Sequence, residues 1–322
     1  MSRVVTTTLE ARGGVVSIGD EHPFVMIGER INPTGRASLT RQLVERDLSS
    51  VREDAVAQVR AGARILDVNA GIPGVDEPEL LSSVVRAVLE VVDVPICIDS
   101  STPSALEAAI PLAEGKVLVN SVTAERESLE RLLPLVKRHG AAVIGMANDE
   151  DGISMDPAVR LAAARKIVRA AEDHGIARSD VVIDPLSMPL GAAPEAATAM
   201  LETIRLIRDE LHVNVSCGAS NISFGMPDRR GIDAAFLSVM IAGGMNAAIT
   251  NPLNREIRKA VLATDLLLGR DAFGAAWIAA HRAEISNGST RPLDEAGGTR
   301  APDIPPSRLA PANASDAPAP SA

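Results

Sequence analysis

The feature that most constrains this fold is a regular alternation of short apolar runs with longer segments of helical period. Eight runs rich in Val, Ile and Ala are predicted to be strands. They cover residues 24–28, 65–69, 96–99, 117–120, 142–146, 181–184, 213–217 and 247–250. Because these runs are apolar at nearly every position, they are typical of parallel strands that are covered on both faces.

Between the runs lie eight amphipathic segments of helical length. They cover residues 41–61, 78–91, 104–112, 127–138, 157–174, 194–211, 231–242 and 254–268. Strands and helices in strict alternation predict a (β/α)8 TIM barrel, and 322 residues are enough to form one. A doubly wound open sheet is the alternative, but no Gly-x-Gly-x-x-Gly motif follows the first strand.

The two ends of the chain depart from this repeat. Residues 1–20 carry Gly13-Gly14 between two β-branched runs, which predicts a hairpin over the N-terminal end of the barrel. The barrel itself is expected to span residues 21–286. Residues 287–322 contain few large apolar side chains and repeated Pro, Ala and Ser, so we expect a disordered tail there.

Composition narrows the class of protein. A net charge of −10 and the lack of a Lys/Arg cluster argue against nucleic-acid binding. Cys97 and Cys217 stand alone in apolar surroundings, so we expect reduced core cysteines rather than structural zinc, an iron–sulfur cluster or a disulfide framework. Neither a secretory signal nor an apolar run long enough to span a bilayer is evident, so a cytoplasmic protein without membrane contact is expected.

Polar side chains follow nearly every predicted strand. In a barrel of this type, the chemistry lies at the C-terminal ends of the strands. The side chains concerned, here called the polar rim, are Glu29, Asn32, Asp67, Asn69, Asp99, Asn120, Asn148, Asp184, Ser220, Asn221 and Asn251. Helix capping explains any one of them, but it does not require an acid inside a strand, as at Asp67 and Asp99.

The chemistry of the polar rim favours a neutral heterocycle as ligand. Carboxylates accept paired N–H donors, and carboxamides donate and accept at once, so the set suits a 2-amino-4-oxo pyrimidine ring such as that of a pterin. None of the five histidines lies at the C-terminal end of a predicted strand, and His and Cys do not cluster. We therefore expect no metal site on this chain.

Seven stretches of the sequence resemble the pterin-binding methyltransferases. They are "IGERINPTGR", "GARILDVNAGIP", "ICIDSS", "VLVNSVTAE", "VVIDPLSMPLG", "VSCGASNISFGMPDRR" and "AAITNPLN", in that order over residues 24–270. Within that family the chain resembles methyltetrahydrofolate:corrinoid protein methyltransferases and the folate domain of cobalamin-dependent methionine synthase. The fold that this implies is the pterin-binding barrel also found in dihydropteroate synthases.

The resemblance implies an activity, partners and site residues. The activity is transfer of a methyl group between N5 of tetrahydrofolate and the cobalt of a corrinoid (cobalamin). A separate corrinoid-binding protein is the expected partner, since an Asp-x-His-x-x-Gly motif is lacking, and a homodimer is implied as well. Asp67, Asn120 and Asp184 match pterin-ring positions, and Asn221 matches the amide that approaches N5, with Asp67 and Asp184 as its proton network. Further residues expected to line the site are Glu29, Asn32, Asn69, Asp99, Ser220 and Arg229.

Two alternative functions stay open from the sequence. A dihydropteroate synthase-like enzyme would share the barrel, but "DPLSMP" stands where such enzymes carry a Gly-rich segment. A late Ser-x-Arg, which they also carry, does not follow the last predicted strand. The other alternative is a non-catalytic protein that binds a pterin or folate and only delivers it.

Overall fold

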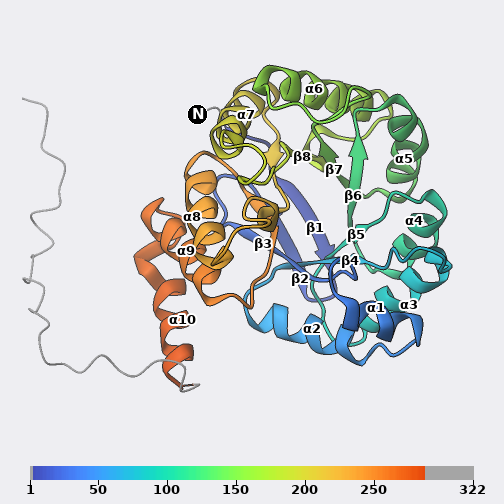
Figure 1. Ribbon diagram of the computed structural model, residues 1–322, viewed down its shortest axis with the longest axis horizontal. Coiled ribbons are helices and arrows are strands. Elements are labelled where there is room, and N and C mark those ends of the chain that lie inside the picture. Colours follow the sequence, from blue (N-terminus) through green and yellow to red (C-terminus); the bar gives the residue numbers. More distant parts are fainter. Residues whose placement is uncertain (1–2, 287–322) are drawn as a thin grey trace, which may run out of the picture. The chain divides into compact units, whose positions relative to one another are not determined.

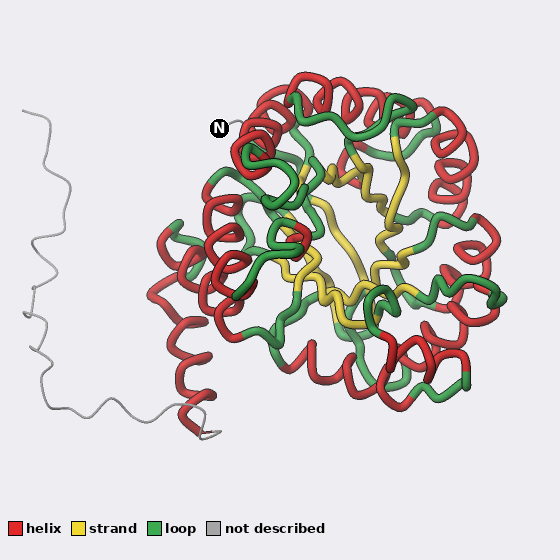
Figure 2. The backbone as a smooth tube through the Cα atoms, in the orientation of Figure 1, coloured by secondary structure: helices red, strands yellow, loops and turns green. Residues whose placement is uncertain are grey.

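A ring of eight parallel strands forms the core of a compact unit that ends at Trp277 (Figures 1 and 2). The computed structural model describes residues 3–286, so the tail expected at 287–322 lies outside the described residues. The strands are β3 (Val25–Ile31), β4 (Ile65–Asn69), β5 (Ile96–Asp99), β6 (Leu118–Thr123), β7 (Ala142–Met146), β8 (Val181–Asp184), β9 (Asn214–Val215) and β10 (Ala247–Thr250). β10 pairs with β3, and Ile249 N donates to Cys217 O at 2.8 Å, which joins β10 to the chain after β9. The predicted (β/α)8 barrel is confirmed.

Helices surround the ring of strands (Figure 1). They are α1 (Ala37–Val44), α2 (Ser49–Arg60), α3 (Glu77–Leu89), α4 (Pro103–Ala109), α5 (Arg126–His139), α6 (Pro157–Asp173), α7 (Ala196–Leu211), α8 (Arg229–Ala242) and α9 (Arg255–Leu267). A further helix, α10 (Ala275–Ser286), extends past Trp277, where the first unit ends. No helix among residues 3–286 is both long and apolar enough to cross a lipid bilayer.

The helix predicted over 41–61 is wrong, because the structure divides it into α1 and α2. Arg46 adopts a φ of 62°, which breaks the helical hydrogen-bond ladder. Asp47 Oδ1 then accepts a hydrogen bond from Ser49 N at 3.0 Å, so a new helix begins. The strict alternation of eight strands with eight helices is therefore not kept, and α10 lies outside the predicted helices.

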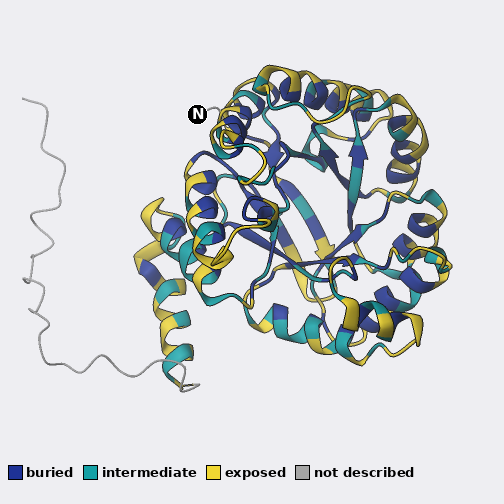
Figure 3. Cartoon of the chain, in the orientation of Figure 1, coloured by how far each residue is buried: buried dark blue, intermediate teal, exposed yellow. Residues whose placement is uncertain are grey.

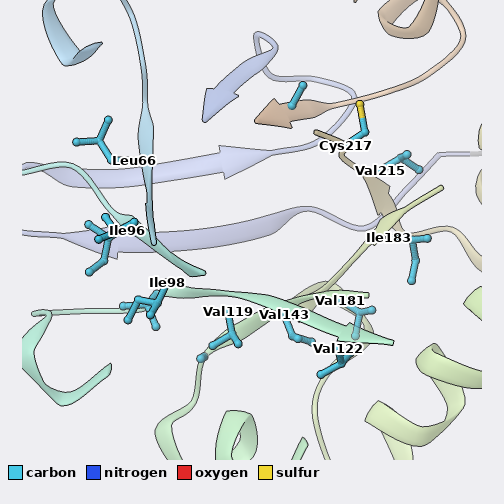
Figure 4. Close-up of a cluster of buried hydrophobic side chains, with 14 of the residues drawn as sticks. Leu66, Ile96, Ile98, Val119, Val122, Val143, Val181, Ile183, Val215 and Cys217 are labelled. Atoms are coloured by element: carbon cyan, nitrogen blue, oxygen red, sulfur yellow. The ribbon is translucent and has the colours of Figure 1, made fainter. Parts of the chain in front are cut away.

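The strands carry two separate layers of apolar side chains. The outward layer packs under the helices (Figure 4) and includes Leu66, Ile98, Val119, Val143, Ile183 and Val215. The inward layer includes Ile27, Ile65, Cys97, Leu118, Ile144 and Val182. The two layers show that side chains alternate along each strand, as period-two geometry requires. Figure 3 shows the resulting burial of the ring.

A hairpin completes the inward layer from the N-terminal side of the chain. Its strands β1 (Thr7–Ala11) and β2 (Gly14–Ile18) pair antiparallel, and Leu9, Val16 and Ile18 join the inward apolar cluster. Asn214 Nδ2 holds the hairpin by donating to Val5 O at 2.8 Å and to Ile18 O at 2.9 Å. The apolar filling at this end of the barrel therefore comes partly from outside the ring.

Candidate functional site

Strand alternation places five residues of the polar rim inside the barrel. Ile27, Ile65, Cys97, Leu118 and Val182 all belong to the inward apolar layer. The residue two positions later on each strand must face the same way. These residues, here called the inward polar layer, are Glu29, Asp67, Asp99, Asn120 and Asp184. The strand register supports this, because Asp99 lies opposite both Asn69 and Asn120 on the neighbouring strands.

Asp67 and Asn120 contact each other directly. Asn120 Nδ2 donates to Asp67 Oδ1 at 3.2 Å, and only 2% of Asp67 is exposed. Burial raises the pKa of Asp67 well above its ordinary value, and the charge of Asp99 raises it further. A carboxyl acceptor therefore lies beside an amide donor in a site that disfavours negative charge.

Asp99 has a pKa raised to about 6, chiefly by burial. A hydrogen bond from the Asn69 side chain opposes this rise, while the charge of Glu77 adds to it. Asn69 Oδ1 also accepts Gly71 N at 2.9 Å, which fixes the turn after β4. The β4–β5 side of the site thus contains two acids whose charged forms are both destabilised.

Asp184 is held by backbone groups rather than by a cation in direct contact. Its Oδ1 accepts the N–H of Leu186 at 2.7 Å, and the Gly218 N–H also donates to the carboxylate. Burial raises the pKa of Asp184 to about 6, and these two donors act against the rise. Leu186 adopts a φ of 68°, so a left-handed residue supplies one of the two donors.

Asn221 lies close to Asp184 through Gly218. It ends the short 3-10 helix η3 (Ala219–Asn221), it is exposed, and its N–H donates to Gly218 O at 3.2 Å. A Cβ atom at Gly218 would lie 3.0 Å from Asn221 Nδ2, so the amide sits directly over this glycine. The chain after β9 therefore carries both a donor to Asp184 and an exposed carboxamide.

Glu29, Ser220 and Arg229 form a network that holds this same loop. Ser220 Oγ donates to Glu29 Oε2 at 2.7 Å, and Arg229 Nη2 donates to Ser220 O at 2.5 Å. Arg229 Nε donates to Ser223 Oγ at 2.9 Å, and its guanidinium carbon lies 5.9 Å from the centre of the Phe224 ring. Burial raises the pKa of Glu29. These side chains are thus engaged with the loop that carries Asn221.

Asn32 directly follows the last residue of β3 and has a local hydrogen-bond partner. Its Oδ1 accepts the N–H of Thr34 at 2.9 Å, which forms a local turn beyond the end of β3. The structure therefore groups Asp67, Asn69, Asp99 and Asn120 on adjacent strands. A second group contains Glu29, Asp184, Ser220, Asn221 and Arg229.

Two residues near the site were missed by the sequence predictions. Glu77 accepts hydrogen bonds from Ser100 Oγ and, at 2.7 Å, from Thr102 Oγ1, and so lies beside Asp99. It follows the N-cap Asp76 and resembles an ordinary first-turn acid. Arg160 is fully buried on α6. A detectable signal existed for it, because Arg160 shares a helical stripe with the buried apolar face of α6.

Comparison with known families agrees with this geometry. Residues 28–251 match the family model described as pterin binding enzyme. The chain belongs to the pterin-binding enzyme family. A relative of this pterin-binding enzyme, the methylcorrinoid:tetrahydrofolate methyltransferase of Eubacterium limosum, is 34% identical over 254 residues, covering 77% of this chain and 92% of the relative. The resemblance predicted from the seven sequence stretches is confirmed.

Solved structures similar to this pterin-binding enzyme include dihydropteroate synthases. The enzyme from Thermus thermophilus in complex with 4-aminobenzoate has a TM-score of 0.61 at 23% identity, covering 81% of this chain and 99% of that one. The Yersinia pestis enzyme with a pterine-sulfa conjugate has a TM-score of 0.60 at 17% identity, covering 81% and 98%. These likenesses establish the shared barrel fold. Within residues 3–286, groups of three His, Cys, Asp or Glu placed to hold a metal ion are not found.

Proposed function

We propose that this enzyme transfers a methyl group between a corrinoid carried by a partner protein and N5 of tetrahydrofolate. The observation that carries the proposal is the inward polar layer, whose acids and amide lie at the C-terminal end of a pterin-binding barrel. The name of the 34% identical relative supports methyl transfer over pteroate synthesis, because the dihydropteroate synthases share less sequence.

Asp67, Asn120 and Asp184 are proposed to bind the pterin ring. The hydrogen bond between Asn120 and Asp67 sets an acceptor beside a donor, which is the pattern that a 2-amino-4-oxo pyrimidine edge requires. Asp184, held by two backbone N–H groups, would accept ring N–H donors from the other side. Asp99, Asn69, Glu29, Asn32, Ser220 and Arg229 would line or support the same site.

Asn221 is proposed to act at N5 of the pterin. In the direction that the relative's name describes, the N5 lone pair attacks the methyl carbon and the carbon–cobalt bond breaks. Cobalt keeps the electron pair of that bond as Co(I), and the N5 proton leaves through the water and carboxyl network of Asp67 and Asp184. In the opposite direction N5 must first gain that proton, because an uncharged amine is a poor leaving group. An exposed amide that hydrogen-bonds N5 can stabilise the charge in either direction.

The corrinoid is proposed to arrive on a separate protein as the second substrate. The histidine motif that would supply a lower axial ligand is lacking in the sequence, and the histidines lie away from the strand ends that form the site. A cytoplasmic location and a homodimer, both expected from the sequence, are part of the same proposal. Light scattering of the purified protein measures the oligomeric state directly.

The test of the proposed function uses the purified full chain, tetrahydrofolate and methylcobalamin under anaerobic conditions. We expect Co(I) cobalamin to appear in the absorption spectrum and methyltetrahydrofolate to accumulate in equal amount. Tight tetrahydrofolate binding without methyl transfer, either from free methylcobalamin or from a methylated corrinoid protein, would favour a delivery protein instead. Condensation of a pterin pyrophosphate with 4-aminobenzoate would favour the dihydropteroate synthase alternative.

A further inference from the structure

Arg160 is a buried cation whose partners are three backbone carbonyls and the sulfur of Met155. It lies in the first turn of α6 and is 0% exposed. Its Nε donates to Ser154 O at 2.6 Å, and its Nη1 donates to Pro185 O at 2.9 Å and Leu186 O at 3.1 Å. None of the ion pairs among residues 3–286 includes Arg160. Burying a charge without a directly paired acid is costly, so such an arginine calls for a specific explanation.

The carbonyls that Arg160 binds belong to two loops, one between β7 and α6 and the other directly after Asp184. Ser154 lies in the loop between β7 and α6, and Pro185 and Leu186 begin the loop between β8 and α7. Leu186 is also the residue whose N–H donates to Asp184 Oδ1. Arg160 is therefore linked to the Asp184 carboxylate through one residue, Leu186, whereas the Gly218 N–H donor comes from the chain after β9.

Leu186 needs such support because of its backbone conformation. Its φ of 68° is left-handed, a conformation that a non-glycine residue adopts at a cost. Arg160 donates hydrogen bonds to the carbonyls of Leu186 and of the preceding Pro185. The guanidinium therefore fixes the backbone of Leu186, whose N–H orients the Asp184 carboxylate. A fork of fixed N–H groups suits this bridging role, which a single ammonium group could fill only in part.

The charge of Arg160 also reaches Asp184. Burial raises the pKa of Asp184, and the positive charge of Arg160 acts in the opposite direction. The other titratable group that faces Asp184 is the Cys217 thiol, whose pKa is raised well above its ordinary value by burial and by Asp184 itself. Since that thiol stays neutral, the positive charge of Arg160 adds to the Leu186 and Gly218 N–H donors in favouring the carboxylate form of Asp184.

We propose that Arg160 is a positioning residue for the pterin site, which fixes the turn after β8 and supplies the buried positive charge that keeps Asp184 ready to accept pterin N–H groups. This inference rests on the proposed function for the identity of the ligand. It does not rest on methyl transfer, and the ligand-free protein carries one arm of its test.

The test compares three variants on the same helix. Arg160→Gln removes the charge but keeps a donor, Arg160→Lys keeps the charge but loses the fork, and Arg165→Gln is the matched control at a partly exposed pair with Glu210. The first readout is the titration of Asp184 in the ligand-free protein, followed by carboxyl 13C NMR and assigned with Asp184→Asn. We expect the Asp184 midpoint to move to higher pH in Arg160→Gln and to stay near that of the unmutated protein in the other two.

The second readout is the dissociation constant of tetrahydrofolate as a function of pH. Arg160→Gln should weaken binding about tenfold at neutral pH and lose less as the pH rises, because Asp184 then ionises without help. Arg160→Lys should weaken binding by a similar factor at every pH, since it lacks only the fork. In an Asp184→Asn background, the pH-dependent part of the Arg160→Gln effect should vanish.

Two results would overturn the inference. One is an unchanged Asp184 midpoint in folded Arg160→Gln, and the other is a loss of affinity in that variant that is equal at all pH values. If Arg160→Gln does not fold, Arg160→Lys decides the role of the charge. An Asp184 midpoint raised in Arg160→Lys would contradict that role. An unchanged midpoint together with weakened tetrahydrofolate binding would support it. If the unmutated protein does not bind tetrahydrofolate, the proposed function fails, while the NMR arm still decides the role of Arg160.

Discussion

The acids at the two ends of the barrel differ in their hydrogen-bond partners and in the direction of their pKa shifts. At the N-terminal end, Asp20 accepts two hydrogen bonds from Arg208 Nη2, at 2.8 and 2.9 Å, and a third from Asn246 Nδ2 at 3.1 Å. At the C-terminal end, no cation among residues 3–286 directly contacts Asp67 or Asp184. The pKa of Asp20 is lowered by its partners, whereas burial raises that of Asp184 to about 6.

We infer from this comparison that the N-terminal end contributes to stability and that the C-terminal end binds the ligand. The acid at the N-terminal end is fully matched inside the protein, so its interactions contribute to folding. The acids at the C-terminal end can accept further hydrogen bonds from N–H donors, and a pterin ring would supply such donors. Stability and binding should therefore respond separately to mutations at the two ends.

The largest expected effect is at the N-terminal end. Arg208→Gln leaves the Asp20 carboxylate and the Asn246 amide without their main partner, so we expect the free energy of unfolding to fall by about 3 kcal/mol. Urea denaturation measures this, and Arg165→Gln, at a surface ion pair, should cost less than about 1 kcal/mol. Tetrahydrofolate affinity should stay within about twofold under conditions where the variant is folded, because the proposed pterin site is at the other end of the barrel.

A large effect on the methyl-transfer rate with little effect on tetrahydrofolate affinity is expected at Asn221. Asn221→Ala should lower the methyl-transfer rate about 100-fold while the tetrahydrofolate dissociation constant changes less than about threefold. Single-turnover kinetics with methylcobalamin separates the two quantities. Asn254→Ala is the matched control, because that amide only caps α9. A transfer rate for Asn221→Ala equal to that of the control would remove its assigned role.

A moderate effect on binding is expected at Asp67. Asp67→Asn should weaken tetrahydrofolate binding by about 1–3 kcal/mol, the cost of leaving a buried N–H donor of the ligand without an acceptor. The same variant should not lose stability at neutral pH, because burial already disfavours the charged form of Asp67. Calorimetric titration and urea denaturation of one preparation test both statements. Loss of stability with unchanged affinity would show that Asp67 stabilises the fold and does not bind tetrahydrofolate.

The smallest expected effect is on the pH dependence of stability. The sign of this dependence differs between the acids at the C-terminal end of the barrel and Asp20 at the N-terminal end. Asp99 and Asp184 have folded pKa values near 6, above the ordinary value of 3.8, so the folded state binds more protons between these values. Their contribution to stability therefore falls as the pH rises through about 6, by an amount on the order of 1 kcal/mol for each group. The contribution of Asp20 is present above 3.8 and is lost as the pH falls through its lowered folded pKa.

Substitution of these acids isolates each contribution. Asp99→Asn or Asp184→Asn should flatten the stability change between about pH 4 and pH 6, whereas Asp20→Asn should lower stability throughout that range and change the pH dependence only below it. Chemical denaturation at a series of pH values measures the difference. If Asp20→Asn changed the slope near pH 6, the assignment of the two ends would be wrong.

Most of the fold follows from local sequence patterns, and the site follows only in part. Runs such as Ile65–Asn69 are short, apolar and bounded by turns, so both their strand character and the polar residue at their end could be predicted. The break between α1 and α2 could not, because it depends on one residue, Arg46, in a left-handed conformation inside an otherwise amphipathic segment.

The contacts that tune the site depend on residues far apart in the chain. Asp184 was predicted from its place at a strand end, but its link to Arg160 requires knowing that the loops after β7 and β8 lie together. Likewise, the bond between Glu29 and Ser220 joins residues 191 positions apart. Local patterns predict which side chains reach the mouth of the barrel, and only the folded chain shows which of them hold one another.

The most direct test of this account is the affinity for tetrahydrofolate of a matched pair, Asp184→Asn and Asp20→Asn. Each variant replaces one buried or partly buried acid by its amide, at opposite ends of the same barrel. We expect Asp184→Asn to weaken binding about tenfold or more and Asp20→Asn to leave it within about twofold while lowering stability. Weaker binding in Asp20→Asn with unchanged binding in Asp184→Asn would contradict the placement of the pterin site.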